Sequence, residues 1–137
     1  MIIKSTNNFL ISNGNRAQLK FPLLCWDMGW ECAEPTLESL PYDFVCRGMD
    51  DSKLFKTVQV KQAYEYADGR QRCDIRKKGK KNTKIKYECG DFDILAAYKP
   101  SSKDWYIIPW EEISNVKSEI NLSREKWDQF RLDHIGV

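Results

Sequence analysis

Two segments with the apolar pattern of β-strands carry polar side chains in their middle. Asp43 lies within LPYDFVC, and Gln59 and Lys61 lie within LFKTVQVKQAY. Side chains two residues apart on a strand leave the same face of a sheet, so Gln59 and Lys61 point the same way. If the two strands pair, Asp43 comes to lie beside them. A carboxylate, an amide and an ammonium on one face can bind a divalent metal ion and a phosphate group.

A plainer interpretation also fits this pattern. A half-exposed strand alternates polar and apolar residues simply because one of its faces meets water. Two features favour a functional site: Val58 and Val60 require a core on their own side, and Asp43 directly follows a Pro-Tyr turn at the start of its strand. On the pattern alone both interpretations stay open.

The cations of the chain are concentrated in one segment, although the net charge is only +2. Residues 70–86, RQRCDIRKKGKKNTKIK, contain nine basic residues and one acid, whereas the rest of the chain has 13 basic and 19 acidic residues. Clustered Lys and Arg bind nucleic acid by releasing counterions from its phosphates, but a charged run also serves as a solvated loop. The candidate DNA-binding residues are Arg70, Arg72, Arg76, Lys77, Lys78, Lys80, Lys81, Lys84 and Lys86.

Length and composition limit the class of protein. The 137 residues, with five Trp, six Tyr and six Phe, suffice for the core of a single domain, 1–137. The five cysteines are odd in number and form no C-x-x-C pair, which argues against a zinc finger, a zinc enzyme or a disulfide scaffold. No segment approaches the length of a membrane span. We therefore expect an intracellular, cytoplasmic protein with reduced thiols and no membrane partner.

The first half of the chain predicts one helix and then strands. Apolar residues at helical spacing predict a helix in residues 13–30, capped by Asn13, with a bend or a broken turn at Pro22, and ended by Gly29. Apolar and alternating runs predict strands at residues 30–35, 42–48, 53–64, 92–98 and 104–109.

The remaining segments predict a hairpin and two further helices. The basic segment is expected to form a hairpin around KKGKKN, where Gly79 and Asn82 supply turn residues. Residues 110–120 and 123–135 are predicted to be helical, the second helix capped by Ser123. This order of elements predicts an α/β or α+β fold with helices packed on a sheet.

The segments PYDFV and VQVKQAY together resemble the PD-(D/E)XK nuclease superfamily. They are most similar to its branch of group I intron homing endonucleases, where Gln replaces the second acid. The segment GNRAQ resembles the helix that supplies a further acid in that branch, and FDILAAYKPSSKDWYIIPWEEI resembles its closing strands. The resemblance covers residues 14–113. It implies a restriction-endonuclease-like mixed central sheet flanked by helices, to which the charge pattern adds a basic β-hairpin.

The resemblance implies metal-assisted hydrolysis of phosphodiester bonds, with Mg²⁺ as the cofactor and Mn²⁺ as a substitute. Asp43 would be the main metal ligand, joined by the amide oxygen of Gln59 and the backbone carbonyl of Val60. Lys61 would orient the attacking water or stabilise the negative charge developing on the phosphate. Gln18 would occupy the position of the helix acid.

Gln18 departs from the family, whose first helix presents Glu at this position. A site with one carboxylate is a poor trap for a hard dication. Another acid, with Glu38 the best candidate, would complete the site; or the chain would have lost cleavage and kept binding; or Gln18 would be an isosteric replacement that weakens metal binding. An ordinary place on the helix surface is a fourth interpretation of Gln18.

Three functions therefore compete. The first is a divalent-metal-dependent DNA endonuclease that acts on double-stranded DNA as a homo-oligomer, a dimer or a tetramer, because one domain of this size covers few base pairs. The second is a catalytically impaired or inactive protein of the same fold that binds DNA or a protein partner. The third is a structural module with a solvated basic loop.

Overall fold

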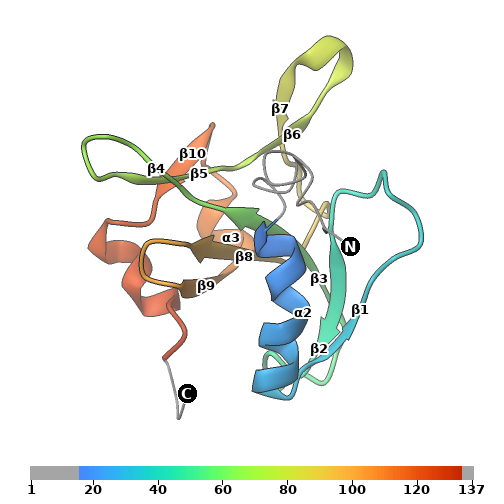
Figure 1. Ribbon diagram of the computed structural model, residues 1–137. Helices are drawn as coiled ribbons and strands as arrows, with labels where there is room; N and C mark the ends of the chain where they lie inside the picture. The colour runs from blue at the N-terminus through green and yellow to red at the C-terminus, as the bar shows by residue number, and fades with distance from the viewer. Residues whose placement is uncertain (1–15, 134–137) are drawn as a thin grey trace, which may run out of the picture.

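The computed structural model describes residues 16–133, and a five-stranded sheet lies at its centre (Figure 1). The strand order is β1-β2-β3-β8-β9. β3 and β8 run parallel, whereas the other neighbours in this sheet are antiparallel, so the predicted mixed sheet is confirmed. The strands are β1 (Glu31–Ala33), β2 (Phe44–Arg47), β3 (Lys56–Gln62), β8 (Ile94–Lys99) and β9 (Asp104–Pro109).

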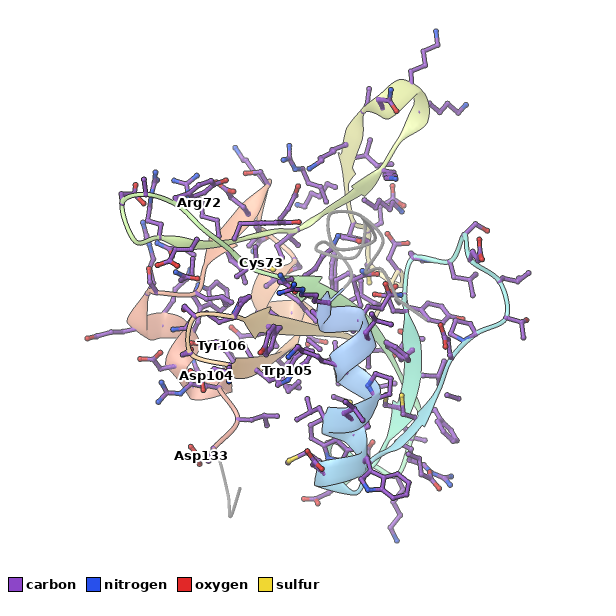
Figure 2. The ribbon with its side chains drawn as sticks, viewed as in Figure 1. Arg72, Cys73, Asp104, Trp105, Tyr106 and Asp133 are labelled. Atoms are coloured by element: carbon purple, nitrogen blue, oxygen red, sulfur yellow. The ribbon has the colours of Figure 1, made fainter. Side chains whose placement is uncertain are left out.

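Helix α2, Arg16–Met28, packs on one face of this sheet (Figure 1). Its buried residues, which include Phe21 and Cys25, recur at intervals of four and so lie on one side of the helix. The ring of Phe21 is 5.1 Å from that of Phe44 and 5.7 Å from that of Trp105, measured between ring centres. Figure 2 shows Trp105 beside the helix. These aromatic contacts fix α2 against strands β2 and β9.

The helix continues through Pro22 without a break. Proline removes one backbone hydrogen bond, but buried side chains on both sides of it pack against the sheet and offset this loss. The helix ends as predicted, at Gly29, whose φ is +72°. The N–H of Trp30 donates to the carbonyl of Cys25 over 2.9 Å, the pattern of a Schellman motif. Asn13, the predicted cap, lies outside the described residues.

The opposite face of the sheet is covered by short elements, including a three-stranded sheet of order β10-β5-β4. Buried Cys73 of β5 joins Leu95 and Tyr106 of the central sheet in one apolar cluster. The elements on this side are β4 (Tyr64–Glu65), β5 (Gln71–Asp74), β10 (Glu119–Asn121), the helix α3 (Trp110–Ile113) and the 3₁₀ helix η3 (Glu125–Phe130). The predicted strand 53–64 is therefore two strands, since β4 belongs to this second sheet.

The basic hairpin is present and projects from the body of the molecule (Figure 1). It consists of β6 (Arg76–Lys78) and β7 (Lys84–Lys86), joined by a 3₁₀ turn, η2 (Lys80–Asn82). Gly79 is needed before this turn because a Cβ there would lie 2.6 Å from the hydroxyl oxygen of Thr83. The two sides of the hairpin approach each other so closely here that a side chain at residue 79 has no room.

The predicted C-terminal helices are wrong in part. Residues 110–120 are helical only over α3, while Glu119–Asn121 form β10, because pairing with β5 overrides the local helical spacing. The second helix is the 3₁₀ helix Glu125–Phe130, and Ser123 does not cap it: the N–H and hydroxyl of Ser123 donate to Oδ1 of Asn121. Within residues 16–133 no helix is long and apolar enough to cross a bilayer.

Replacing Phe21, which is fully buried, by Ala should lower the free energy of unfolding by about 3–5 kcal/mol, because it opens a cavity between helix and sheet. Leu23→Ala, in the same helix but 66% exposed, is the matched control and should change it by less than about 0.5 kcal/mol. Urea unfolding measures both. Equal losses in the two variants would contradict the described packing.

Candidate active site

The pairing of β2 with β3 places Asp43 against the backbone of β3, as predicted. The N–H of Asp43 donates to the carbonyl of Val58 over 2.8 Å, and the N–H of Val60 donates to Oδ2 of Asp43 over 2.8 Å. Val58 and Val60 are buried under α2, while Gln59 and Lys61 leave the other face. The carboxylate is therefore held at the start of β2 by the strand that carries the amide and the amine.

Gln18 lies in the first turn of α2, and its Nε2 donates to Oδ1 of Asp43 over 3.0 Å. The N–H of Ala17 donates to Oε1 of Gln62 over 3.2 Å, which ties the start of the helix to the end of β3. Gln18 is thus in contact with the predicted site, and an ordinary place on the helix surface does not describe it.

Gln59 is 9% exposed, and its Nε2 donates to the carbonyl of Val60 over 3.2 Å. Val60 therefore takes part in two polar contacts, donating its N–H to Asp43 and accepting from Gln59. The three residues predicted to be metal ligands lie together.

The ammonium of Lys61 sits between a carbonyl and an aromatic ring. Its Nζ donates to the carbonyl of Arg76 over 3.1 Å and lies 5.4 Å from the ring centre of Tyr87. Burial lowers the pKa of Lys61, against the opposing effect of nearby groups that include Asp74 and Asp43. Burial raises the pKa of Asp43, and the N–H of Val60 and the charge of Lys61 reduce this effect without cancelling it. For both Asp43 and Lys61, the loss of contact with water therefore outweighs the attraction between the two charges.

These groups face a cleft of about 1060 Å³. Gln18, Asp43, Gln59, Val60 and Lys61 all line it, and so does Glu38, the acid proposed to complete the site. The hairpin forms part of its wall through Arg76, Lys77, Lys78 and Lys84. The structure thus brings one edge of the basic segment to the predicted catalytic residues.

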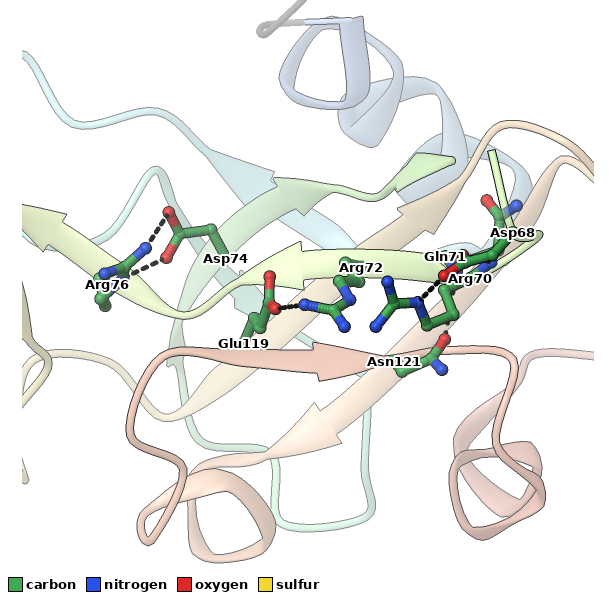
Figure 3. Close-up of polar contacts among 8 residues, drawn as sticks. All are labelled: Asp68, Arg70, Gln71, Arg72, Asp74, Arg76, Glu119 and Asn121. Carbon is green, nitrogen blue, oxygen red and sulfur yellow. Dashed lines mark hydrogen bonds and ion pairs between the residues drawn. The ribbon is translucent and has the colours of Figure 1, made fainter. Parts of the chain in front are cut away.

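The basic segment is divided between two places rather than lying on one hairpin. Arg72 lies in β5 and Arg70 directly precedes this strand, so both are away from the hairpin. Arg72 pairs with Glu119, and Arg70 pairs with Asp68 over 2.5 Å (Figure 3). Three cations nearer the cleft also have carboxylate partners: Arg76 and Lys84 pair with Asp74, and Lys77 pairs with Asp91.

Four lysines of the segment are exposed and form no ion pair within residues 16–133: Lys78, Lys80, Lys81 and Lys86. They belong to the projecting hairpin, whose side chains extend into solvent (Figure 2). The charge available to an external polyanion is concentrated there.

Asp74 and Asp91 line the cleft but were not among the predicted site residues. Asp91 accepts from the N–H of Glu88 over 2.9 Å and from Nζ of Lys77 over 2.7 Å. Despite burial, these two contacts leave the pKa of Asp91 below its ordinary value. Local sequence spacing does not indicate the contact of Asp91 with Lys77, because Lys77 lies on β6, across the hairpin from Asp91.

Comparison with known proteins decides the family. The sequence model of the PD-(D/E)XK endonucleases matches residues 12–135. The chain belongs to the PD-(D/E)XK endonuclease family. A solved structure of a bacterial homing endonuclease, I-Ssp6803I, has the same fold, with a TM-score of 0.72 and 24% sequence identity over 93% of this chain and 89% of that one. No curated protein matches the sequence.

PD-(D/E)XK nucleases generally use divalent metals, and the donors in this cleft fit such an ion. Mg²⁺ is bound through one or two carboxylates, with water and substrate phosphate as further ligands. Asp43 offers the carboxylate and Val60 the carbonyl oxygen, and Gln59 offers its amide oxygen after a half-turn of the amide. The Gln18 amide, which donates to Oδ1 of Asp43, competes with a cation for that oxygen.

Asp43→Asn should raise the Tm of the metal-free protein at neutral pH. A raised pKa in the folded state means that the folded chain holds the proton more tightly, so stability falls as pH rises from the ordinary carboxyl pKa through the raised one. The substitution removes this loss and keeps an oxygen that can accept from Val60. Thermal unfolding in chelator across the acidic to neutral range measures it.

Asp50→Asn is the control with the opposite sign. The hydroxyl and N–H of Ser52 donate to the Asp50 carboxylate and lower its pKa, so removing that charge should lower the Tm. A fall in Tm for Asp43→Asn as large as that for Asp50→Asn would contradict the unfavourable burial of Asp43.

Proposed function

We propose that this protein is a divalent-metal-dependent endonuclease that hydrolyses phosphodiester bonds of double-stranded DNA. One observation carries the proposal: the Asp43 carboxylate lies between the N–H of Val60 and the amide of Gln18, in a cleft that also holds Lys61 and one edge of a basic hairpin. Family membership supports nuclease chemistry at this cleft.

Asp43, Gln59 and the carbonyl of Val60 would hold Mg²⁺, or Mn²⁺ in its place. When bound, the ion offsets the negative charge of the phosphate and lowers the pKa of a bound water. Lys61 supplies a second positive charge and a proton donor on the same face, to orient the attacking water or to stabilise the charge on the phosphate oxygens. Its partial burial strengthens that interaction, because charges interact more strongly where water is excluded.

Gln18 favours a second candidate function, binding without cleavage. Its neutral amide donates to Asp43 where a helix acid would add a second negative charge for the metal. A protein with this arrangement would bind DNA through the hairpin and cut it slowly or not at all. Glu38, on the wall of the same cleft, is the acid that would compensate.

Cleavage of supercoiled and long linear DNA in Mg²⁺ and Mn²⁺ separates the two functions. We expect Asp43→Asn to lower the cleavage rate at least about 100-fold, since it removes the charge that holds the metal. Gln18→Glu should raise the rate by about tenfold or more, because a second carboxylate strengthens metal binding by over about 1.4 kcal/mol.

Each outcome identifies a different site. Cleavage by the Gln18→Glu protein alone supports the binding-only function for this chain. Cleavage by both, with loss in Glu38→Gln, assigns the second carboxylate to Glu38. Cleavage that persists in Asp43→Asn at the full rate contradicts the proposed site.

The unpaired lysines of the hairpin should supply most of the salt-dependent affinity for DNA. Replacing Lys78, Lys80 and Lys81 by Gln should reduce the slope of log K against log salt by about 0.9 for each phosphate that the variant no longer neutralises. The matched control replaces three exposed lysines outside the cleft and hairpin, Lys53, Lys103 and Lys117. Fluorescence anisotropy over a range of salt measures both slopes, and equal changes would show that the hairpin has no special part in binding.

We also propose that the active form is a homo-oligomer, a dimer or a tetramer. One domain of this size covers few base pairs, and two copies related by two-fold symmetry would present one cleft to each strand of a duplex. A DNA substrate is consistent with an intracellular, cytoplasmic location and with partners that are not membranes.

A further inference from the structure

Three cysteines from three successive elements meet at the end of α2 opposite to Gln18. Cys25 comes from α2, Cys32 from β1 and Cys46 from β2, and their sulfur atoms lie within 4.8 Å of one another. Cys32 and Cys46 are direct partners in the β1–β2 register. The sequence does not indicate this cluster by the usual metal-binding spacing, since no two of the three form a C-x-x-C pair.

The cluster is closed on the protein side and open on the other. Cys25 and Cys46 are buried in the apolar layer beneath α2, whereas Cys32 is half-buried. Cys25 and Cys32 line a cavity of about 410 Å³ whose wall also includes Trp30 and Glu34. A small ion can therefore reach Cys25 and Cys32 through this cavity, and Cys46 lies directly behind them.

The thiols of Cys32 and Cys46 are held in their protonated form when nothing is bound. Burial raises the pKa of Cys32 to about 11. The contact with Cys25, together with burial, raises the pKa of Cys46 well above its ordinary range. Such thiols are poor nucleophiles, but a thiophilic metal ion displaces their protons and binds the thiolates.

We propose that Cys25, Cys32 and Cys46 form a binding site for a thiophilic d¹⁰ metal ion, Zn²⁺ or Cu⁺. Thiolate ligands select these ions over Mg²⁺, which prefers oxygen. Sulfurs around a tetrahedral zinc ion lie about 3.8 Å apart, given zinc–sulfur bonds of about 2.3 Å, so small side-chain rotations suffice from the observed spacing. Binding releases three protons to solvent and transfers no electrons.

The two ions differ in what completes their coordination. Zinc takes a fourth ligand, for which a water molecule or the carboxylate of Glu34 is available in the cavity. Cu⁺ is satisfied by three thiolates. In both cases the ion joins the last turn of α2 to β1 and β2. The first turn of α2 carries Gln18, and Asp43 directly precedes β2, so the ion would fix the two elements that position these residues. This site is distinct from the cleft and does not depend on the proposed nuclease function.

Cobalt is the probe that distinguishes thiolate from oxygen ligands, because sulfur-to-cobalt charge transfer gives a near-ultraviolet absorption band. Reduced, metal-free protein is titrated with Co²⁺, and separate samples then receive Zn²⁺ or chelator-buffered Cu⁺. We expect the band to appear with Co²⁺ and to disappear when a second metal ion displaces the cobalt. Displacement by Zn²⁺ identifies the site as a zinc site, and displacement by Cu⁺ alone identifies it as a copper site. The Asp43→Asn protein should give the same band, since the cleft offers oxygen ligands.

Cys32→Ser is the informative variant, because its half-buried position tolerates a hydroxyl better than the buried positions of Cys25 and Cys46. This substitution should weaken metal binding by more than about 100-fold. That is a larger loss than substitutions of residues that only contact the ligands usually cause. Cys89→Ser, at an exposed cysteine outside the cluster, is the control and should bind as the unchanged protein does. The proposal is overturned if the unchanged protein gives no cobalt band and retains no more Cu⁺ than the Cys32→Ser variant does. It is also overturned if the Cys32→Ser variant gives a cobalt band as strong as that of the unchanged protein.

Discussion

The candidate active site depends on the register of β3, which pairs with β2 on one side and with β8 on the other. This double pairing puts Val58 and Val60 under α2 and sends Gln59 and Lys61 to the other face. A shift by one residue would exchange the two faces, turning the amine toward the helix and the valines toward the cleft. The same register brings the N–H of Val60 to Asp43. Packing of the core and assembly of the site are therefore one constraint.

The site is electrostatically unfavourable in the absence of a ligand. Burial raises the pKa of Asp43 and lowers that of Lys61, so both charges are held in a place that disfavours them. Folding of the surrounding sheet and helix maintains this arrangement, since the elements on either side bury large aromatic residues such as Phe21 and Tyr106. A divalent ion and a phosphate would compensate the two charges at once. Gln18 adds no charge, which limits how strongly the cleft attracts the ion.

Several elements of the fold and several residues of the candidate site could be predicted from the local sequence pattern. The alternation around Gln59 and Lys61, the acid after a Pro-Tyr turn and the Gly29 helix end are each set by neighbours in sequence. The structure also has the hairpin that the charge pattern indicates and the mixed sheet that the family resemblance implies. The rest depended on contacts between distant segments. Residues 119–121 form a strand only because β5 lies beside them. The ion pairs of Arg72 with Glu119 and of Lys77 with Asp91, and the meeting of the three cysteines, leave no trace in local spacing.

The most direct test of a metal site in the cleft locates the divalent ion. Mn²⁺ broadens the amide signals of nearby residues in a ¹⁵N-labelled protein, and a sub-stoichiometric titration reports its first binding site. We predict that the signals of Asp43 and Val60 weaken first and that this effect disappears in Asp43→Asn. Broadening that begins elsewhere, on the hairpin or around Cys32, or that persists in Asp43→Asn, would show that the cleft is not the metal site.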